Sequence, residues 1–319
     1  MRQRPPLFGL TDLLLLVTVC IWAVNLIVIK NVIGGVLAPI AFTALRFALA
    51  ALILLPMLRS LTPAERAVSS SDRWKIIGLG LIGNSVYQVF FITGLANTLP
   101  TNAALILATP PIFIALIGAM FKLEKLTWLA WLGILLSFGG IALVILGNAP
   151  TETADSAARP LFGDLMTLGA AIMWALYMLL AAPVLKRHAP LKITALTVSV
   201  GAVPLSVIAT PAFLTTDWSN VSTTTWLGVL YCGGVAIALG YILWNRSVQQ
   251  VGAARTAVYS NLTPVLVALV SWLVRGDPIT IYHVVGAVVI LTGITLTRLG
   301  RRPRAPVMSP APTLEETLF

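Results

Sequence analysis

Long apolar blocks alternate with short polar segments along the whole chain. A membrane-spanning helix needs about 20 predominantly apolar residues. Ten blocks reach that length, at residues 10–30, 38–58, 74–97, 101–121, 128–147, 162–184, 192–213, 226–246, 255–274 and 281–299. The first block is longer than the apolar core of a signal peptide and no small-residue cleavage pattern follows it, which favours an uncleaved helix. The pattern therefore predicts an all-α membrane protein with ten transmembrane helices.

Composition supports this class and excludes a soluble domain. Of the 319 residues, 58% are hydrophobic and 10% are charged, whereas about a quarter of the residues of a soluble domain are charged. Cys20 and Cys232 both fall inside apolar blocks, and His188 and His283 are isolated. The sequence therefore predicts no disulfide framework, no metal site and no cofactor.

The net charge of +10 would suit a nucleic-acid partner, but the distribution of the basic residues argues against one. They sit in short segments between the apolar blocks, as in membrane proteins whose cytoplasmic loops are enriched in lysine and arginine. With the N-terminus inside, seventeen basic residues fall on the inner side, and only Lys30, Arg159 and Arg275 fall on the outer side. This bias requires an even number of spans, so both termini are predicted to be cytoplasmic.

Three segments outside the predicted spans carry signals of their own. Residues 60–72 contain Thr62-Pro63-Ala64-Glu65, an N-cap, a proline at the first helical position and an acid three residues after the cap, which predict a short interfacial helix. Residues 148–161 form the longest outer loop and link the two halves of the chain. Residues 300–319 are rich in proline and predict a disordered cytoplasmic tail.

The chain also contains an internal repeat. Asp12 and Trp22 have the same spacing as Asp164 and Trp174, which lie 152 residues further on. A shift of 153 residues pairs Ala104 with Ala257, Pro111 with Pro264, Glu124 with Asp277, Thr127 with Thr280, Gly133 with Gly286 and Gly140 with Gly293. The repeats are residues 1–147 and 162–299, and because each holds five spans the second must be inverted in the membrane. Inverted repeats are typical of secondary transporters, which bind solute near the midplane between the halves.

Several short motifs give the chain a family resemblance. They are Trp22-Ala23-Val24-Asn25 with Lys30, the Arg46-Phe47 pair, Pro111 followed by Glu124, and the run from Gly133 to Gly140. In this order, over residues 10–299, they resemble the EamA-type transporters of the drug/metabolite transporter superfamily. The resemblance implies a ten-helix carrier of the inner (plasma) membrane, commonly an exporter of amino acids or other metabolites. The second half departs from the family pattern at Gly276-Asp277-Pro278, where Gly-Glu is usual.

Two prolines are predicted to interrupt helices at the midplane. Pro111 and Pro264 lie close to the middle of their blocks, where proline removes a backbone hydrogen bond and frees a carbonyl group. One interpretation is a broken helix whose polar groups face a cavity, which a membrane tolerates only where protein or water surrounds them. The alternative is a kink that affects packing alone. Recurrence in both repeats favours the cavity.

Arg46 is the one charge near the centre of a predicted span. Because a central arginine is costly in a bilayer, it needs a partner. Arg46 could hold a substrate carboxylate, or it could bond the freed carbonyls of a kinked neighbour and stabilise the fold; its occurrence in the family across varied substrates favours the structural role. Asp12 and Asp164 only open their spans, where the helix dipole favours an acid, so the sequence offers no carboxylate at depth for proton coupling.

Aromatic and amide side chains recur near the middle of several spans and form the rest of the candidate substrate site. They are Trp22, Asn25, Asn84, Tyr87, Gln88, Trp174, Tyr177, Tyr241, Trp244, Tyr259 and Asn261. An aromatic wall with scattered amides suits an organic molecule that has an apolar part. The alternative is ordinary helix packing with interhelical hydrogen bonds.

These observations predict a secondary transporter that exports amino acids or related compounds by alternating access. The expected partners are a small-molecule substrate and the lipid bilayer; the oligomeric state stays open, and a monomer is possible. A channel or uncoupled facilitator is the alternative. A membrane-embedded enzyme is disfavoured because neither GxSxG nor HExxH occurs and His283 has no acid one turn away.

Overall fold

The computed structural model describes residues 9–33, 35–121, 124–146, 160–251, 256, 259 and 262–303. Within these ranges, seven segments are long and apolar enough to cross a membrane: Leu10–Val32, Pro39–Ser60, Ser70–Asn97, Pro100–Met120, Pro160–Leu185, Pro190–Thr215 and Thr223–Gln250. Three shorter apolar helices, Trp128–Val144, Thr263–Arg275 and Ile281–Thr297, lie in the remaining predicted blocks. The chain is therefore a multi-pass helical membrane protein. The full ten-span topology and the cytoplasmic termini stay predictions.

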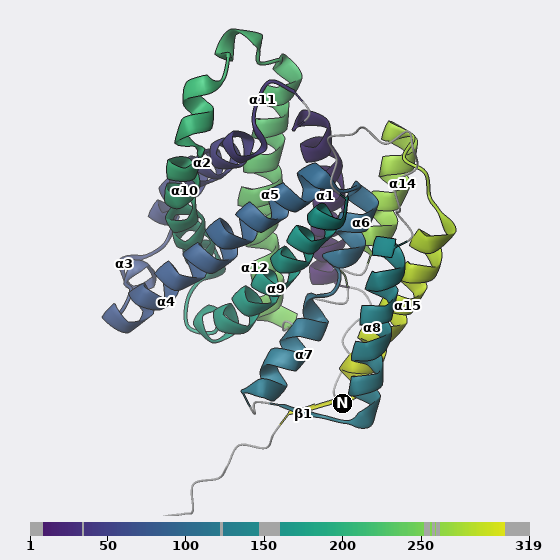
Figure 1. Ribbon diagram of the computed structural model, residues 1–319. Helices are drawn as coiled ribbons and strands as arrows, with labels where there is room; N and C mark the ends of the chain where they lie inside the picture. Colours follow the sequence, from purple (N-terminus) through teal and green to yellow (C-terminus); the bar gives the residue numbers. More distant parts are fainter. Residues whose placement is uncertain are drawn as a thin grey trace, which may run out of the picture.

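Figure 1 shows the helices as a single bundle. In chain order the elements are α1 (Leu10–Val32), α2 (Pro39–Met57), η1 (Leu58–Ser60), α3 (Pro63–Arg66), α4 (Ser70–Gly80), η2 (Leu81–Val86), α5 (Tyr87–Asn97), α6 (Pro100–Ile106), α7 (Pro110–Met120), β1 (Glu124–Leu126), α8 (Trp128–Leu146), α9 (Pro160–Leu185), α10 (Pro190–Thr215), η3 (Trp218–Asn220), α11 (Thr223–Leu230), η4 (Tyr231–Leu239), α12 (Gly240–Val251), α14 (Thr263–Arg275), α15 (Ile281–Leu299) and β2 (Arg301–Pro303).

The short helix predicted after the second span is present as α3. The Thr62 hydroxyl accepts a hydrogen bond from the Glu65 amide at 3.3 Å, and the Thr62 amide donates to the Glu65 carboxylate at 2.9 Å. The Thr62 amide and hydroxyl both donate to the Glu65 carboxylate, which stabilises its ionised form and lowers the pKa of Glu65. The capping motif read from the sequence is confirmed.

The two halves of the chain interleave instead of packing as separate bodies. α2 packs against α10 and η4, α5 packs against α9, and α1 packs against α12 and α14. Most close contacts of each half are therefore made with the other half. A cavity near the middle of the bundle is consequently lined from both halves.

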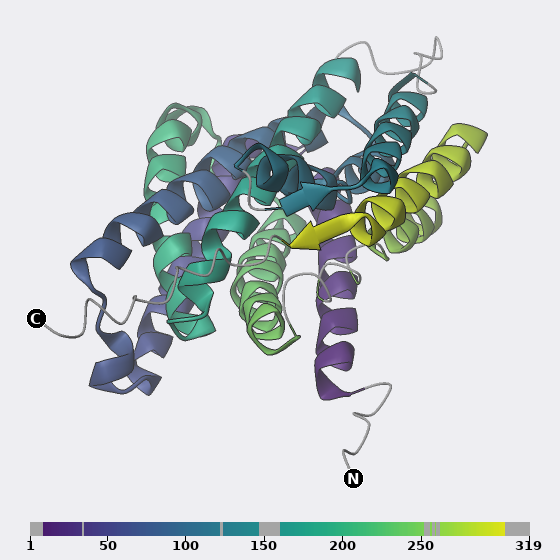
Figure 2. The ribbon, with the colours of Figure 1, turned by 90° about the horizontal axis from the view of Figure 1, so that it is seen from below.

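α8 and α15 pair closely at one edge of the bundle (Figures 1 and 2). A Cβ atom on Gly133 would lie closer than 3.0 Å to the Thr297 amide nitrogen, and one on Gly293 would meet the Ser137 hydroxyl as closely. Only glycine permits this separation of the two backbones. The glycines that the repeat pairs with one another therefore serve to pack these two helices.

One part of the predicted tail is ordered. β2 pairs antiparallel with β1, Leu126 opposite Arg301 and Glu124 opposite Pro303 (Figure 2). The Thr127 amide also donates to the Gly300 carbonyl oxygen at 3.0 Å. The expectation of disorder from residue 300 onward is thus wrong for residues 300–303, because composition does not register a strand partner 177 residues earlier in the chain. Residues 304–319 and most of the 148–161 linker lie outside the described residues.

Candidate functional site

The fourth apolar segment is a broken helix. α6 ends at Ile106 and α7 begins at Pro110. The intervening turn is held by the Thr109 hydroxyl, which donates to the Ile106 carbonyl oxygen at 2.6 Å. Pro110 and Pro111 open α7, where their missing N–H groups would have no intrahelical partner. Pro264 similarly lies at the start of α14, and both prolines are buried.

Two π-helical segments lie in corresponding spans of the two halves. η2 precedes Tyr87 and Gln88, and η4 precedes Tyr241 and Trp244. A π-helical turn inserts an extra residue, widens the helix and leaves carbonyl groups available to other donors. Such segments occur frequently at functional sites. In both halves the residues that directly follow the π-helical segment include aromatic side chains that line the cavity.

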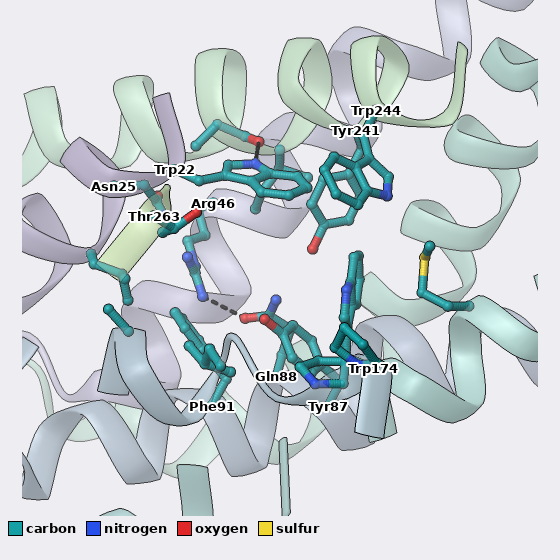
Figure 3. A pocket seen from close by; sticks show the side chains of 18 of the residues that line it. Trp22, Asn25, Arg46, Tyr87, Gln88, Phe91, Trp174, Tyr241, Trp244 and Thr263 are labelled. Atoms are coloured by element: carbon teal, nitrogen blue, oxygen red, sulfur yellow. Dashed lines mark hydrogen bonds between the residues drawn. The ribbon is translucent and has the colours of Figure 1, made fainter. Parts of the chain in front are cut away.

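These elements enclose a cavity of about 120 Å³ between the halves (Figure 3). Nine of the predicted site residues line it: Trp22, Asn25, Arg46, Tyr87, Gln88, Pro111, Trp174, Tyr241 and Trp244. The other described lining residues are Leu26, Phe91, Ala104, Leu107, Pro110, Ile114, Met178, Ala236, Ile237 and Thr263. None of these nineteen residues is acidic. Within the described ranges, no group of three or more His, Cys, Asp or Glu residues could hold a metal ion.

Aromatic rings from both halves meet in the cavity wall. The ring centroids of Trp22 and Trp174, the repeat-equivalent pair, are 6.3 Å apart and nearly perpendicular at 87°. Tyr241 lies 6.0 Å from Trp22 and 5.9 Å from Trp174, and Tyr87 lies 5.2 Å from Trp174. Offset and edge-on aromatic pairs of this kind stabilise a protein by more than the burial of their surface alone. The wall is therefore one continuous aromatic cluster built across the boundary between the halves.

Arg46 is buried in α2, and its guanidinium lies at the cavity. Its Nη2 donates to the side-chain oxygen of Gln88 at 2.5 Å, a bond drawn in Figure 3. The rings of Phe42, Phe47 and Phe91 lie within 5.8 Å of the guanidinium carbon, a distance typical of cation–π contacts. The structure thus differs from the expectation that carbonyls of a kinked neighbour would satisfy this charge. A side-chain amide and aromatic faces surround it instead, because Gln88 and the three phenylalanine rings are the groups that pack against it.

Three buried polar atoms at the cavity have no hydrogen-bond partner among the described residues. They are Arg46 Nε, Trp244 Nε1 and Asn25 Oδ1. Buried polar groups are nearly always hydrogen-bonded, so unpaired ones require an explanation. Two donors and one acceptor, all on residues that line this cavity, are thus left unpaired in this conformation.

Four of the remaining predicted site residues, Asn84, Tyr177, Tyr259 and Pro264, are described and do not line the cavity. Asn84 is buried against Gly201, and Tyr177 lies behind Trp174, stacked on it at 5.1 Å. The Tyr259 hydroxyl donates to Asp12 Oδ1 at 2.6 Å near the start of α1. Asn261 lies outside the described residues, and Pro264 is buried beside Thr263, which does reach the cavity.

The lining residues missed by sequence reasoning are mostly apolar. Leu26, Phe91 and Met178 each follow a predicted aromatic residue, Trp22, Tyr87 and Trp174, by four positions. Residues four apart share a helix face. A search at helical spacing from the predicted aromatic residues would therefore have identified these three residues, whereas a search for polar residues could not.

The fold and cavity define a multi-pass membrane protein with a solute-sized chamber between two interleaved halves. The model of the EamA-like transporter family matches residues 9–146 and again residues 161–299, so the chain belongs to that family. This confirms the resemblance stated from the motifs. Membership makes the chain a membrane transporter of small solutes, and it indicates a transporter instead of an enzyme.

Named relatives agree with this class. The "Uncharacterized transporter YyaM" of Bacillus subtilis is 31% identical over 82% of this chain and 84% of its own. The "Probable terminal-alkyne amino-acid exporter" of Streptantibioticus cattleyicolor is 27% identical over 71% of this chain and 74% of its own. A solved crystal structure superposes with a TM-score of 0.64, covering 91% of this chain and 96% of that chain at 19% identity, which supports the fold alone.

Proposed function

We propose that this chain is a secondary transporter that exports a small amino acid or a closely related metabolite by alternating access. The observation that carries the proposal is the buried guanidinium of Arg46 at an aromatic cavity whose described lining contains no acid. A carboxylate is the group that a planar guanidinium binds best, through two parallel hydrogen bonds. The solute therefore supplies the missing negative charge.

The rest of the lining fits the remainder of an amino acid. Asn25 Oδ1 is an unpaired acceptor, and an ammonium group needs acceptors. The aromatic cluster suits an apolar side chain. A cavity of about 150 Å³ accommodates benzene, so the volume of about 120 Å³ favours a small metabolite over a polycyclic drug.

Alternating access is supported by the arrangement of the chain. Each half matches the family model separately, and the cavity lies where the halves interleave. The break between α6 and α7 provides a hinge whose two sides can move separately. Export is inferred from the printed name of the Streptantibioticus relative, an amino-acid exporter.

The test is a matched set of solutes presented to the purified protein. L-leucine, 3-methylbutylamine and 4-methylpentanoate share one apolar group and differ in the carboxylate and ammonium groups. We expect L-leucine to raise the thermal unfolding midpoint most and 3-methylbutylamine, which lacks the carboxylate, not to raise it. Equal stabilisation by the amine would rule out the role given to Arg46.

Transport in proteoliposomes separates a carrier from a channel. A carrier should saturate with L-leucine, and unlabelled leucine on the opposite side should accelerate flux of the labelled solute. Flux that rises linearly and shows no such exchange would favour the uncoupled channel over alternating access.

A further inference from the structure

A buried polar cluster joins the two halves at the opposite end of α6 from the cavity. Thr98 and Asn102 come from the first half, and Asp164 and His283 come from the second. All four are at most 4% exposed, and Asp164 is fully buried. The cluster therefore contains a buried carboxyl group, so Asp164, which was expected only to open its helix, also lies inside the protein.

Hydrogen bonding fixes the state of His283. The Thr280 amide donates to His283 Nδ1 at 3.1 Å, so Nδ1 is an acceptor and carries no proton. His283 Nε2 must then be the N–H that donates to Asn102 Oδ1 at 2.7 Å. The oxygen of Asn102 is thus occupied, and its amide nitrogen, Nδ2, is free to donate.

Asp164 is only half satisfied. The Thr98 hydroxyl donates to Asp164 Oδ1 at 2.5 Å. Asp164 Oδ2 and Asn102 Nδ2, an acceptor and a donor, both lack a partner among the described residues. An ionised buried carboxylate is stabilised by a cation or by several donors, and one hydroxyl supplies neither.

The charged groups around the cluster are engaged elsewhere. Lys30 Nζ donates to the carbonyl oxygens of Leu95, Ala96 and Thr98, at 2.8, 3.1 and 2.7 Å. Arg275 pairs with Asp277 at 3.0 Å. His283 reaches Asp164 only through Asn102. Within the described ranges no cation is bonded to Asp164; the adjoining linker, which carries Glu152, Asp155 and Arg159, lies outside them.

We propose that Asp164 is a proton-binding site coupled to α6. With a proton on the carboxyl group, the Thr98 hydroxyl supplies the hydrogen bond that holds Asp164 Oδ1. When the proton leaves, the charge on Oδ2 attracts the idle Nδ2–H of Asn102 and draws α6 toward α9. Ala104, on the same seven-residue helix, and Leu107 directly after it line the cavity, so this movement reshapes the solute chamber.

Infrared spectroscopy of the reconstituted protein tests the proposal without any solute, so its outcome is independent of the transport assay. The carbonyl stretch of a protonated carboxyl group should be present at low pH and disappear as the pH rises. Asp164→Asn should remove this band. The matched control is Asp12→Asn at the repeat-equivalent position. Both carboxylate oxygens of Asp12 already accept hydrogen bonds, one from the Gly9 amide and one from the Tyr259 hydroxyl. The Asp12→Asn variant should therefore retain the band.

Two further variants keep the proposal testable even if Asp164→Asn does not fold. Thr98→Val removes the hydroxyl donor and should raise the frequency of the same band. Asn102→Ala removes the donor available to the ionised carboxylate, so the band should persist to higher pH. A band that is unchanged in Asp164→Asn, or in both Thr98→Val and Asn102→Ala, would overturn the proposal.

Discussion

The indole nitrogen of Trp22 donates a hydrogen bond to the Ala236 carbonyl oxygen at 3.1 Å, across the boundary between the two halves. Ala236 lies within the π-helical segment η4, where a carbonyl is available to an outside donor. The repeat-equivalent Trp174 lies in α9, which packs against η2, the corresponding segment, but it stacks on Tyr177 and forms no such bond among the described residues. The two halves therefore hold their equivalent tryptophans differently in this conformation.

This difference predicts unequal effects of the same substitution. Trp22→Phe and Trp174→Phe remove the same side-chain volume, but only the first removes a hydrogen bond. We expect Trp22→Phe to lower the free energy of unfolding by about 1 kcal/mol more than Trp174→Phe does. Thermal unfolding of both variants in the same detergent measures the difference, and equal loss would show that the Trp22 bond adds nothing to this conformation.

The pairing of α8 with α15 gives a prediction with its control on the same helix. A Cβ atom at Gly133 would collide with the backbone of α15, whereas one at Gly139 would meet nothing within 4 Å. Gly133→Ala should therefore destabilise the protein by about 1–3 kcal/mol. Gly139→Ala should be neutral or stabilising by about 0.5–1 kcal/mol, because alanine is the better helix former.

Denaturation midpoints of these two alanine variants test the arrangement of the helices. If Gly133→Ala is as stable as Gly139→Ala, the close approach of α8 and α15 is wrong.

The break between α6 and α7 predicts a functional effect without loss of folding. In the double variant Pro110→Ala, Pro111→Ala, both residues could continue a helix through Thr109 and close the turn that borders the cavity. We expect normal membrane insertion and yield but slowed leucine flux in proteoliposomes. Pro264→Ala is the control, because Pro264 lies outside the cavity lining; a double variant that transports as fast as Pro264→Ala would show that the break has no role.

Much of the architecture could be predicted because it depends on local signals. Block length located the apolar helices, and Thr62 with Glu65 located a capped turn. The repeat shift identified Trp22 and Trp174, which do meet at the cavity. Each of these depends on residues close together in sequence or on a spacing that recurs.

What could not be predicted depends on which helices meet. Gln88 lies 42 residues from Arg46, and nothing local distinguishes it from other amides. Asp164 resembles any acid at the start of a helix in the sequence, and only the packing of α5 and α6 against α9 makes it a buried group. The pairing of β1 with β2 could not be predicted for the same reason, since neither segment alone has the pattern of a strand.

Arg46 gives the sharpest test of the proposed site. Its Nη2 is bonded to Gln88, while its buried Nε has no partner among the described residues. Lysine would keep the charge but lose the planar fork of donors, and glutamine would lose the charge.

If the solute carboxylate completes the site, both Arg46→Lys and Arg46→Gln should fold, and Arg46→Gln should lose a charged hydrogen bond of about 1.5–3 kcal/mol. That loss corresponds to leucine binding roughly 10- to 100-fold more weakly, with Arg46→Lys in between. Folded yield and leucine affinity measured on the same two preparations decide the matter. Affinity that falls only in step with the folded fraction would return Arg46 to the structural role that the sequence favoured.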